Sequence, residues 1–234
     1  MREASKIASQ TQKRVEELMH KLEVYYIANK SDNIYFALLG DCSTSSNEEE
    51  GFDEEVINTG KKMVDILNKK YPDEKFTKFN FIYRKRMWNE GEEAYLGWER
   101  KRGLLNQFNE YILGNISNPF KTNTITNVAS MPPIKYIITL DADTDLVLNS
   151  AKELIGAMAH ILNKPELDVN KNIVKKGHAL LQPRVGVNLN DSNKNVFTKI
   201  FAGAGGIDNY TNAISDVYQD NFDEWIFTGK GIYD

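Results

Sequence analysis

The chain has 234 residues, of which 41% are apolar and 26% charged, and these ordinary globular values argue against a disordered chain. The 29 Lys and Arg residues and 33 Asp and Glu residues leave a net charge of −4, which argues against a nucleic-acid partner. Cys42 is the single cysteine, no run of 18 apolar residues occurs, and the first residues lack a signal-peptide core, so we expect a soluble chain in a reducing compartment.

The first half of the chain alternates between helical and strand-like patterns. Apolar residues at helical spacing predict helices over residues 6–26 and 56–67, and a third helix is expected from about residue 92 to residue 113. Short apolar runs predict strands at residues 34–39 and 79–83.

The second half begins with residues 115–133, which are rich in Asn, Ser, Thr and Pro and predict a loop that is partly disordered. The pattern then predicts, in order, a strand at 134–140, a helix over 151–162, a strand at 179–185, and short helices near 194–201 and 208–219. Strands that alternate with helices predict an α/β fold with a mainly parallel sheet covered on both faces. We expect one domain over residues 1–234 because no linker divides the chain.

Acidic residues follow two of the predicted strands directly. Asp41 ends the first strand, and Asp141 and Asp143 end the strand at 134–140. Ligands of open α/β sheets bind beyond the carboxyl ends of the strands. Two carboxylates two residues apart can hold a hard divalent cation, which would bridge the phosphates of a nucleotide. The alternative is a solvated turn in which Asp143 or Asp145 caps the next helix.

Three segments, in this order, resemble the inverting glycosyltransferases of the GT-A superfamily. They are Asp41-Cys-Ser-Thr44, Lys101-Arg-Gly-Leu-Leu-Asn106 and Leu140-Asp-Ala-Asp-Thr144. They look like that superfamily's uracil-contacting aspartate, its G-K-x-x-x-L-N-like segment and its D-x-D motif. The resemblance implies a Rossmann-like GT-A fold, truncated here at both ends.

Longer segments narrow the resemblance to the glycosyltransferase region of cyclic β-1,2-glucan synthases, which belongs with glycosyltransferase families 2 and 84. These segments run from about residue 22 to the last residue, and several are six to eight residues long with unusual composition. They comprise residues 22–29, 36–39, 98–103, 181–185, 215–220 and 227–234.

The resemblance implies transfer of glucose from UDP-glucose to the 2-hydroxyl of a growing β-1,2-glucan, with inversion and with Mg²⁺ or Mn²⁺. Asp141 and Asp143 would hold the metal, which stabilises the charge of the leaving UDP. Asp41 would accept a hydrogen bond from uracil N3–H. The other donor-binding candidates are Lys101, Asp141, Gly229 and Lys230, where glycine permits a close approach to the donor phosphates.

Two departures from the family pattern matter. The chain begins in a helix, whereas GT-A enzymes begin with a strand whose loop holds the nucleotide. The general base, the Q-x-x-R-W-like acceptor segment and the membrane helices of the family would all lie beyond Asp234. We therefore expect a fragment, inactive by itself, of the cytoplasmic part of an inner-membrane or plasma-membrane enzyme. Asp216 and Asp220 are alternative candidates for the base, although their spacing on a helix equally fits a structural role.

Two other interpretations remain open. A haloacid-dehalogenase-type phosphatase also has a D-x-D after an apolar strand, and Asp141 would then be its nucleophile and Asp143 its acid/base. Such phosphatases usually have Thr or Val where this chain has Asp145. The second alternative is a non-catalytic nucleotide-binding module.

Overall fold

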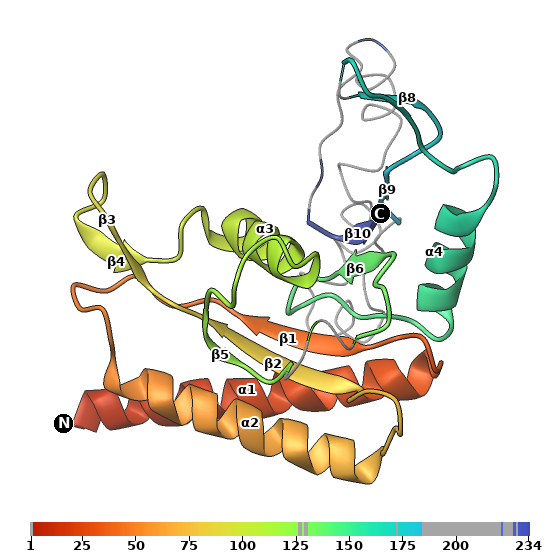
Figure 1. Ribbon diagram of the computed structural model, residues 1–234. Helices are drawn as coiled ribbons and strands as arrows, with labels where there is room; N and C mark the ends of the chain where they lie inside the picture. The colour runs from red at the N-terminus through yellow and green to blue at the C-terminus, as the bar shows by residue number, and fades with distance from the viewer. Residues whose placement is uncertain are drawn as a thin grey trace, which may run out of the picture. The chain divides into compact units, whose positions relative to one another are not determined.

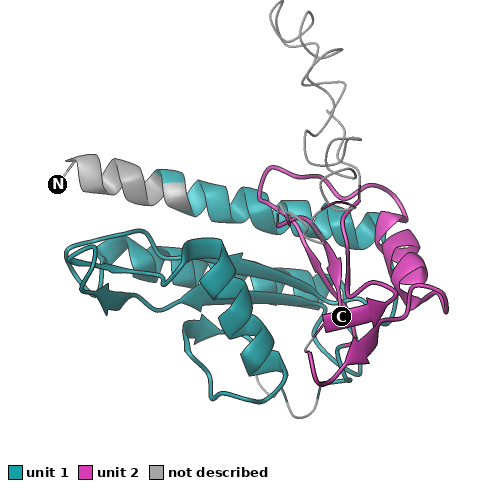
Figure 2. Ribbon diagram, turned by 90° about the horizontal axis from the view of Figure 1, so that it is seen from above, with its two compact units in different colours: residues 1–134 teal, residues 135–234 magenta. Residues whose placement is uncertain are grey.

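The computed structural model describes residues 2–125, 128, 131–171, 173–183, 221, 227 and 229–234. The chain divides into two compact units, Met1–Ile134 and Lys135–Asp234, which Figure 2 shows in two colours. The expectation that they form a single domain stays a prediction. Within the described residues, no helix combines the length and the apolar character needed to cross a membrane.

In its described residues the first unit contains three helices, a three-stranded sheet and a two-stranded hairpin. In chain order its elements are α1 (Arg2–Ala28), β1 (Phe36–Gly40), α2 (Gly51–Lys70), β2 (Phe79–Arg84), β3 (Met87–Asn89), β4 (Ala94–Leu96), α3 (Arg100–Ile112) and β5 (Phe120–Asn123). The helices predicted at 6–26 and 56–67 and the strands predicted at 34–39 and 79–83 are confirmed.

The sheet of the first unit has the strand order β1-β2-β5. Helices α1 and α2 lie along one face of this sheet and α3 lies on the other (Figure 1). Strand β2 is buried along its whole length because alternate residues serve the two faces. Phe79 packs against Tyr26 of α1 with ring centroids 5.4 Å apart, whereas Ile82 joins a cluster with Leu104 of α3 and Phe120.

The expectation of a mainly parallel sheet is wrong for the described residues. β1 and β2 are parallel, with Gly40 opposite Tyr83, but β5 runs antiparallel to β2. The chain enters β5 beside Arg84, at the carboxyl end of β2, so β5 has to run back along β2. The fold is therefore mixed α/β, and the GT-A arrangement stays a prediction.

The helix expected over residues 92–113 is shorter than predicted. Residues 87–96 form the antiparallel β3–β4 hairpin, and α3 starts only at Arg100. Glu93 in the hairpin turn has a φ of 48°, which is incompatible with a right-handed helix. The expected loop at 115–133 contains strand β5, and residues 126–127 and 129–130 lie outside the described residues.

The second unit contains one helix and five short strands in the described residues. They are β6 (Ile137–Thr139), α4 (Ser150–Ala159), β7 (Glu166–Asp168), β8 (Ile173–Lys176), β9 (Leu180–Leu181) and β10 (Gly231–Tyr233). β10 lies between β6 and β9 and is antiparallel to both, and β7 and β8 form a hairpin. The strand predicted at 134–140 is thus found in shorter form as β6, and β9 lies within the strand predicted at 179–185, of which residues 184–185 are outside the described residues. The helices predicted near 194–201 and 208–219 lie outside the described residues.

Candidate functional site

Asp41 follows β1 directly, at the carboxyl end of the parallel β1–β2 pair. Because Gly40 lies opposite Tyr83, the next residues of the two strands, Asp41 and Arg84, are neighbours. The Asp41 side chain is 29% exposed, and Arg84 Nη1 lies 3.5 Å from its Oδ1. The backbone N–H of Cys42 donates a hydrogen bond of 3.0 Å to the same oxygen. Asp41 is therefore a partly exposed carboxylate that is held through one of its two oxygens.

Arg84 is the partner that holds Asp41, and the sequence analysis did not single it out. Its side chain is 1% exposed. Nε donates to Gln107 Oε1 at 2.8 Å, Nη1 to the carbonyl of Arg100 at 3.0 Å, and Nη2 to the carbonyl of Trp98 at 2.6 Å. The sequence does contain a signal for Arg84, because it is a cation at the carboxyl end of the predicted strand at 79–83. Asp41 was identified by the same kind of position, at the carboxyl end of the strand before it.

A second buried arginine fastens the loop after Asp41. Arg86 Nε donates to the carbonyl of Ser43 at 2.7 Å and Nη2 donates to Ser43 Oγ at 3.0 Å, while Nη1 pairs with the fully buried Asp53. Burial by itself raises the pKa of the Asp53 carboxyl, but hydrogen bonds from Arg86, Tyr83 and the Glu50 backbone outweigh it and hold that pKa below its usual value. The end of β2 thus anchors the segment from Asp41 to Ser43.

Lys101 lies in the first turn of α3 and is half-buried. The residues before it, Glu99 and Arg100, have φ values of 48° and 47°, which are uncommon for residues with a side chain. Arg102 is exposed, pairs with Glu99, and lies over the Trp98 ring at 5.8 Å from its centroid. The predicted role of Lys101 in donor binding stays a prediction.

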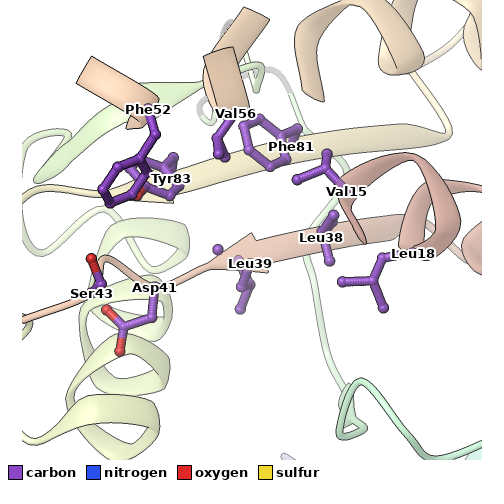
Figure 3. A pocket seen from close by; sticks show the side chains of 11 residues that line it. Val15, Leu18, Leu38, Leu39, Asp41, Ser43, Phe52, Val56, Phe81 and Tyr83 are labelled. Carbon is purple, nitrogen blue, oxygen red and sulfur yellow. The ribbon is translucent and has the colours of Figure 1, made fainter. Parts of the chain in front are cut away.

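A cavity of about 490 Å³ lies beside Asp41 in the first unit (Figure 3). Asp41 and Ser43 form its polar end, and helices α1 and α2 and strands β1 and β2 supply mainly apolar walls. The lining residues are Val15, Leu18, Leu38, Leu39, Gly40, Asp41, Ser43, Phe52, Val56, Phe81 and Tyr83. Such walls suit a flat, weakly polar ring better than a phosphate.

The second unit contains Asp141, Asp143 and Lys230, and it brings two of these predicted site residues, Asp141 and Lys230, into contact. Asp141 and Asp143 follow β6, and Lys230 precedes β10, whose Gly231 lies opposite Thr139 of β6. This register places Lys230 Nζ at 3.5 Å from Asp141 Oδ2. Asp143 is exposed, and its Oδ1 accepts a hydrogen bond from Thr144 Oγ1 at 3.4 Å.

Gly229, the other predicted phosphate contact, has a φ of 82°, a conformation that glycine adopts without strain. It therefore turns the chain immediately before Lys230. Asp216 and Asp220, the candidates for the general base, lie outside the described residues.

The chemistry of Asp141 and Asp143 fits a magnesium or manganese ion only in combination with a ligand. Among the described residues, no group of three or more His, Cys, Asp or Glu side chains could hold a metal ion. Mg²⁺ is usually bound through one or two carboxylates together with substrate phosphates and water. Two carboxylates therefore suffice if a diphosphate supplies the other oxygens, and the metal would share Asp141 with Lys230.

Cys42 does not have the properties of a nucleophile. Burial, and after it the Asp41 carboxylate, raise the pKa of the Cys42 thiol to about 11. Thiolate is the reactive form of cysteine, so this side chain is inert near neutral pH.

These arrangements define an α/β chain in which acidic side chains directly follow a strand in both units, Asp41 after β1 and Asp141 after β6. No protein-family model matches the chain. It is similar to the cyclic beta-(1,2)-glucan synthase NdvB of Rhizobium meliloti (strain 1021), with 39% identity over 222 residues. The alignment covers 94% of this chain and 8% of the relative. Identity at this level over nearly the whole chain means that the chain is related to a segment of that enzyme.

Proposed function

We propose that the chain is the donor-binding region of an inverting GT-A glycosyltransferase that transfers glucose from UDP-glucose to the 2-hydroxyl of a growing β-1,2-glucan. The observation that carries this proposal is the 39% identity over 94% of the chain to a segment of a cyclic beta-(1,2)-glucan synthase. That relative is much longer than this chain, so donor binding is the first activity to test and transfer the second.

In this proposal Asp41 recognises the nucleobase. Asp41 is one of the residues that line the cavity in the first unit, its carboxylate is partly exposed, and the other lining residues are mainly apolar. A uracil ring combines apolar faces with an N3–H donor on its edge. An acceptor of fixed position against apolar walls matches that combination, and a hydrogen bond to a charged acceptor is stronger than a neutral one.

Asp141, Asp143 and Lys230 bind the diphosphate in this proposal. Mg²⁺ or Mn²⁺ held there would offset the negative charge that develops on the leaving UDP. Asp141 and Asp143 supply carboxylate oxygens to the ion, and Lys230 adds a positive charge beside Asp141. The inverting reaction also needs a carboxylate within reach of the attacking hydroxyl, and Asp216 and Asp220 remain hypotheses for that role.

Calorimetry with UDP, in the presence and absence of Mn²⁺, tests donor binding. We expect Mn²⁺ to strengthen UDP binding, and Asp143→Asn to remove this strengthening. Glu153→Gln is the matched control because it removes one exposed carboxylate from the same unit. Asp41→Ala should weaken UDP binding with and without Mn²⁺, while Asp65→Asn on the exposed side of α2 should not.

Activity assays separate the proposal from the other two interpretations. A phosphatase would hydrolyse p-nitrophenyl phosphate and lose this activity in Asp141→Asn. A non-catalytic module would bind UDP but leave UDP-glucose intact even within a longer protein that includes the flanking regions. Elongation of a β-1,2-glucan primer by that longer protein, lost in Asp143→Asn, is the result expected for the glycosyltransferase.

A further inference from the structure

We propose that Arg84 is a positioning residue for nucleotide binding. It fixes the Asp41 carboxylate and, through the same guanidinium group, the turn at residues 97–103 that begins α3 and carries Lys101. This inference rests on the proposed function, because it assigns Asp41 to the nucleobase. Arg84 reaches no ligand itself, since its side chain is 1% exposed.

The distances identify Arg84 as the fixed partner and Asp41 as the group that is positioned. Three of the contacts of Arg84, to Gln107 and to the carbonyls of Trp98 and Arg100, measure 2.6–3.0 Å. The contact with Asp41 Oδ1 measures 3.5 Å, which is longer than an ordinary N–H···O hydrogen bond. Arg84 therefore steadies the carboxylate by charge without fully occupying it, and the carboxylate remains able to accept a hydrogen bond from a ligand.

The chemistry of this position is specific to arginine. A buried charge is tolerated only where hydrogen bonds and an opposite charge compensate it. The planar guanidinium directs separate N–H groups at Gln107, at two carbonyls and at Asp41, whereas the ammonium of a lysine is a compact point charge on a flexible stem. Arg84→Lys would therefore keep the charge and lose the geometry.

The turn before α3 needs an external support. Glu99 and Arg100 both have positive φ, which is a strained conformation for residues with side chains. The carbonyls of Trp98 and Arg100, on either side of Glu99, both accept hydrogen bonds from Arg84. We infer that these two bonds hold the turn, and with it the start of α3 and Lys101.

Two glycines show how closely Asp41, Arg84 and the turn before α3 pack together. A Cβ at Gly97 would lie 2.5 Å from Asp41 Oδ1 and 2.6 Å from Arg84 Nη1. A Cβ at Gly103 would lie 1.9 Å from the Trp98 carbonyl oxygen and 2.8 Å from Arg84 Nη2. Gly97→Ala therefore offers a second variant that disturbs the Asp41–Arg84 contact and leaves the buried charge in place.

Hydrogen exchange tests the coupling without any ligand. The amides of Arg100 and Gly103 donate to the carbonyls of Gly97 and Glu99 within the turn. We expect Arg84→Met to speed exchange at both amides by about tenfold or more, because the turn loses its support. Lys85→Met is the matched control, since Lys85 is the exposed neighbour and pairs with Glu48. Unchanged exchange at Arg100 and Gly103 in a folded Arg84→Met would overturn the proposal.

Base discrimination tests the role in binding. UDP has the N3–H group that would donate a hydrogen bond to Asp41, whereas N3-methyl-UDP lacks it, and we expect the wild type to prefer UDP by roughly 10-fold to 100-fold. In Arg84→Met the ratio of the two dissociation constants should fall close to one. The double variant Asp41→Asn/Arg84→Met should have the same ratio as Asp41→Asn alone. A support needed only for folding would weaken both nucleotides equally and leave the wild-type preference intact, which would contradict the positioning role.

The remaining outcomes are also decisive. If Arg84→Met fails to fold, Gly97→Ala takes its place and must show the same loss of preference for UDP. Gly91→Ala in the hairpin turn is its control. A retained preference in Gly97→Ala would refute the proposal. If the wild type binds neither nucleotide, the proposed function fails, whereas hydrogen exchange still decides whether Arg84 couples the turn to the end of β1.

Discussion

The Tyr83 hydroxyl donates a hydrogen bond of 2.6 Å to the Asp53 carboxylate and so joins β2 to the first turn of α2. The carboxylate also accepts the Glu50 backbone N–H at 3.0 Å and pairs with Arg86. Burial and the hydrogen bond to Asp53 raise the pKa of the Tyr83 hydroxyl, which therefore stays a donor. The buried Asp53 side chain thus caps α2, joins β2 to this helix, and pairs with Arg86, which anchors Ser43.

Replacing this carboxylate should destabilise the first unit strongly. Asp53→Asn leaves Arg86 buried without its opposite charge, and breaking such a pair typically costs about 3–5 kcal/mol. Urea unfolding followed by circular dichroism measures the loss. Glu54→Gln in the same helical turn is the control: its partner Lys121 is 3.5 Å away and Glu54 is largely exposed, so we expect less than about 1 kcal/mol. Equal losses in the two variants would contradict the central role of Asp53.

The same carboxyl should make stability depend on pH in the acid range. Its pKa is lower in the folded chain than the value of about 3.9 expected for the unfolded chain. A group of this kind contributes stability above its unfolded pKa and loses that contribution as the pH falls through its folded pKa. Below about pH 4 we therefore expect the free energy of unfolding to fall more steeply for the wild type than for Asp53→Asn. Parallel pH profiles would show that Asp53 is not responsible.

Gly60 is required by the packing of α2 on β2. A Cβ at this position would lie 2.5 Å from Cδ1 of the Phe81 ring, and Phe81 is too deeply buried to move aside. Overpacking typically costs about 1–3 kcal/mol, which exceeds the roughly 0.5–1 kcal/mol that alanine gains over glycine in a helix. Gly60→Ala should thus lower the melting temperature. Gly51→Ala on the same helix meets nothing within 4 Å and should not lower it.

Lys230 should moderate the effect of a metal on nucleotide binding. Its ammonium lies 3.5 Å from Asp141 Oδ2. In the proposed function it would therefore compete with a cation for that carboxylate and would also attract the diphosphate. Lys230→Met should weaken UDP binding about 2-fold to 5-fold without metal, as befits a partly exposed pair, and should increase the strengthening by Mn²⁺. Lys152→Met on the exposed side of α4 is the control. If calorimetry shows the same two affinities as for the wild type, Lys230 does not contact the donor.

Local patterns predicted the long helices and the buried strands because their periodicity is written in consecutive residues. Apolar residues at helical spacing located α1 and α2, and the apolar run around Phe81 located β2. The β3–β4 hairpin and β5 were missed because strands of three or four residues carry little periodicity. The direction of β5 depends on which strand lies beside it, and no local pattern encodes that choice.

The candidate site likewise contains residues that local patterns predicted and residues that they did not. The apolar runs predicted that Asp41, Asp141 and Asp143 follow strands, since each run and the acid after it are adjacent in the chain. Arg84 meets Asp41 and the turn before α3, and Arg86 and Asp53 hold the loop after β1, only in the folded chain. Their partners lie 14 to 43 residues away along the chain. Strand register and helix packing create such contacts. A buried guanidinium needs a hydrogen-bond acceptor for each of its N–H groups, and only folding brings these distant acceptors around it.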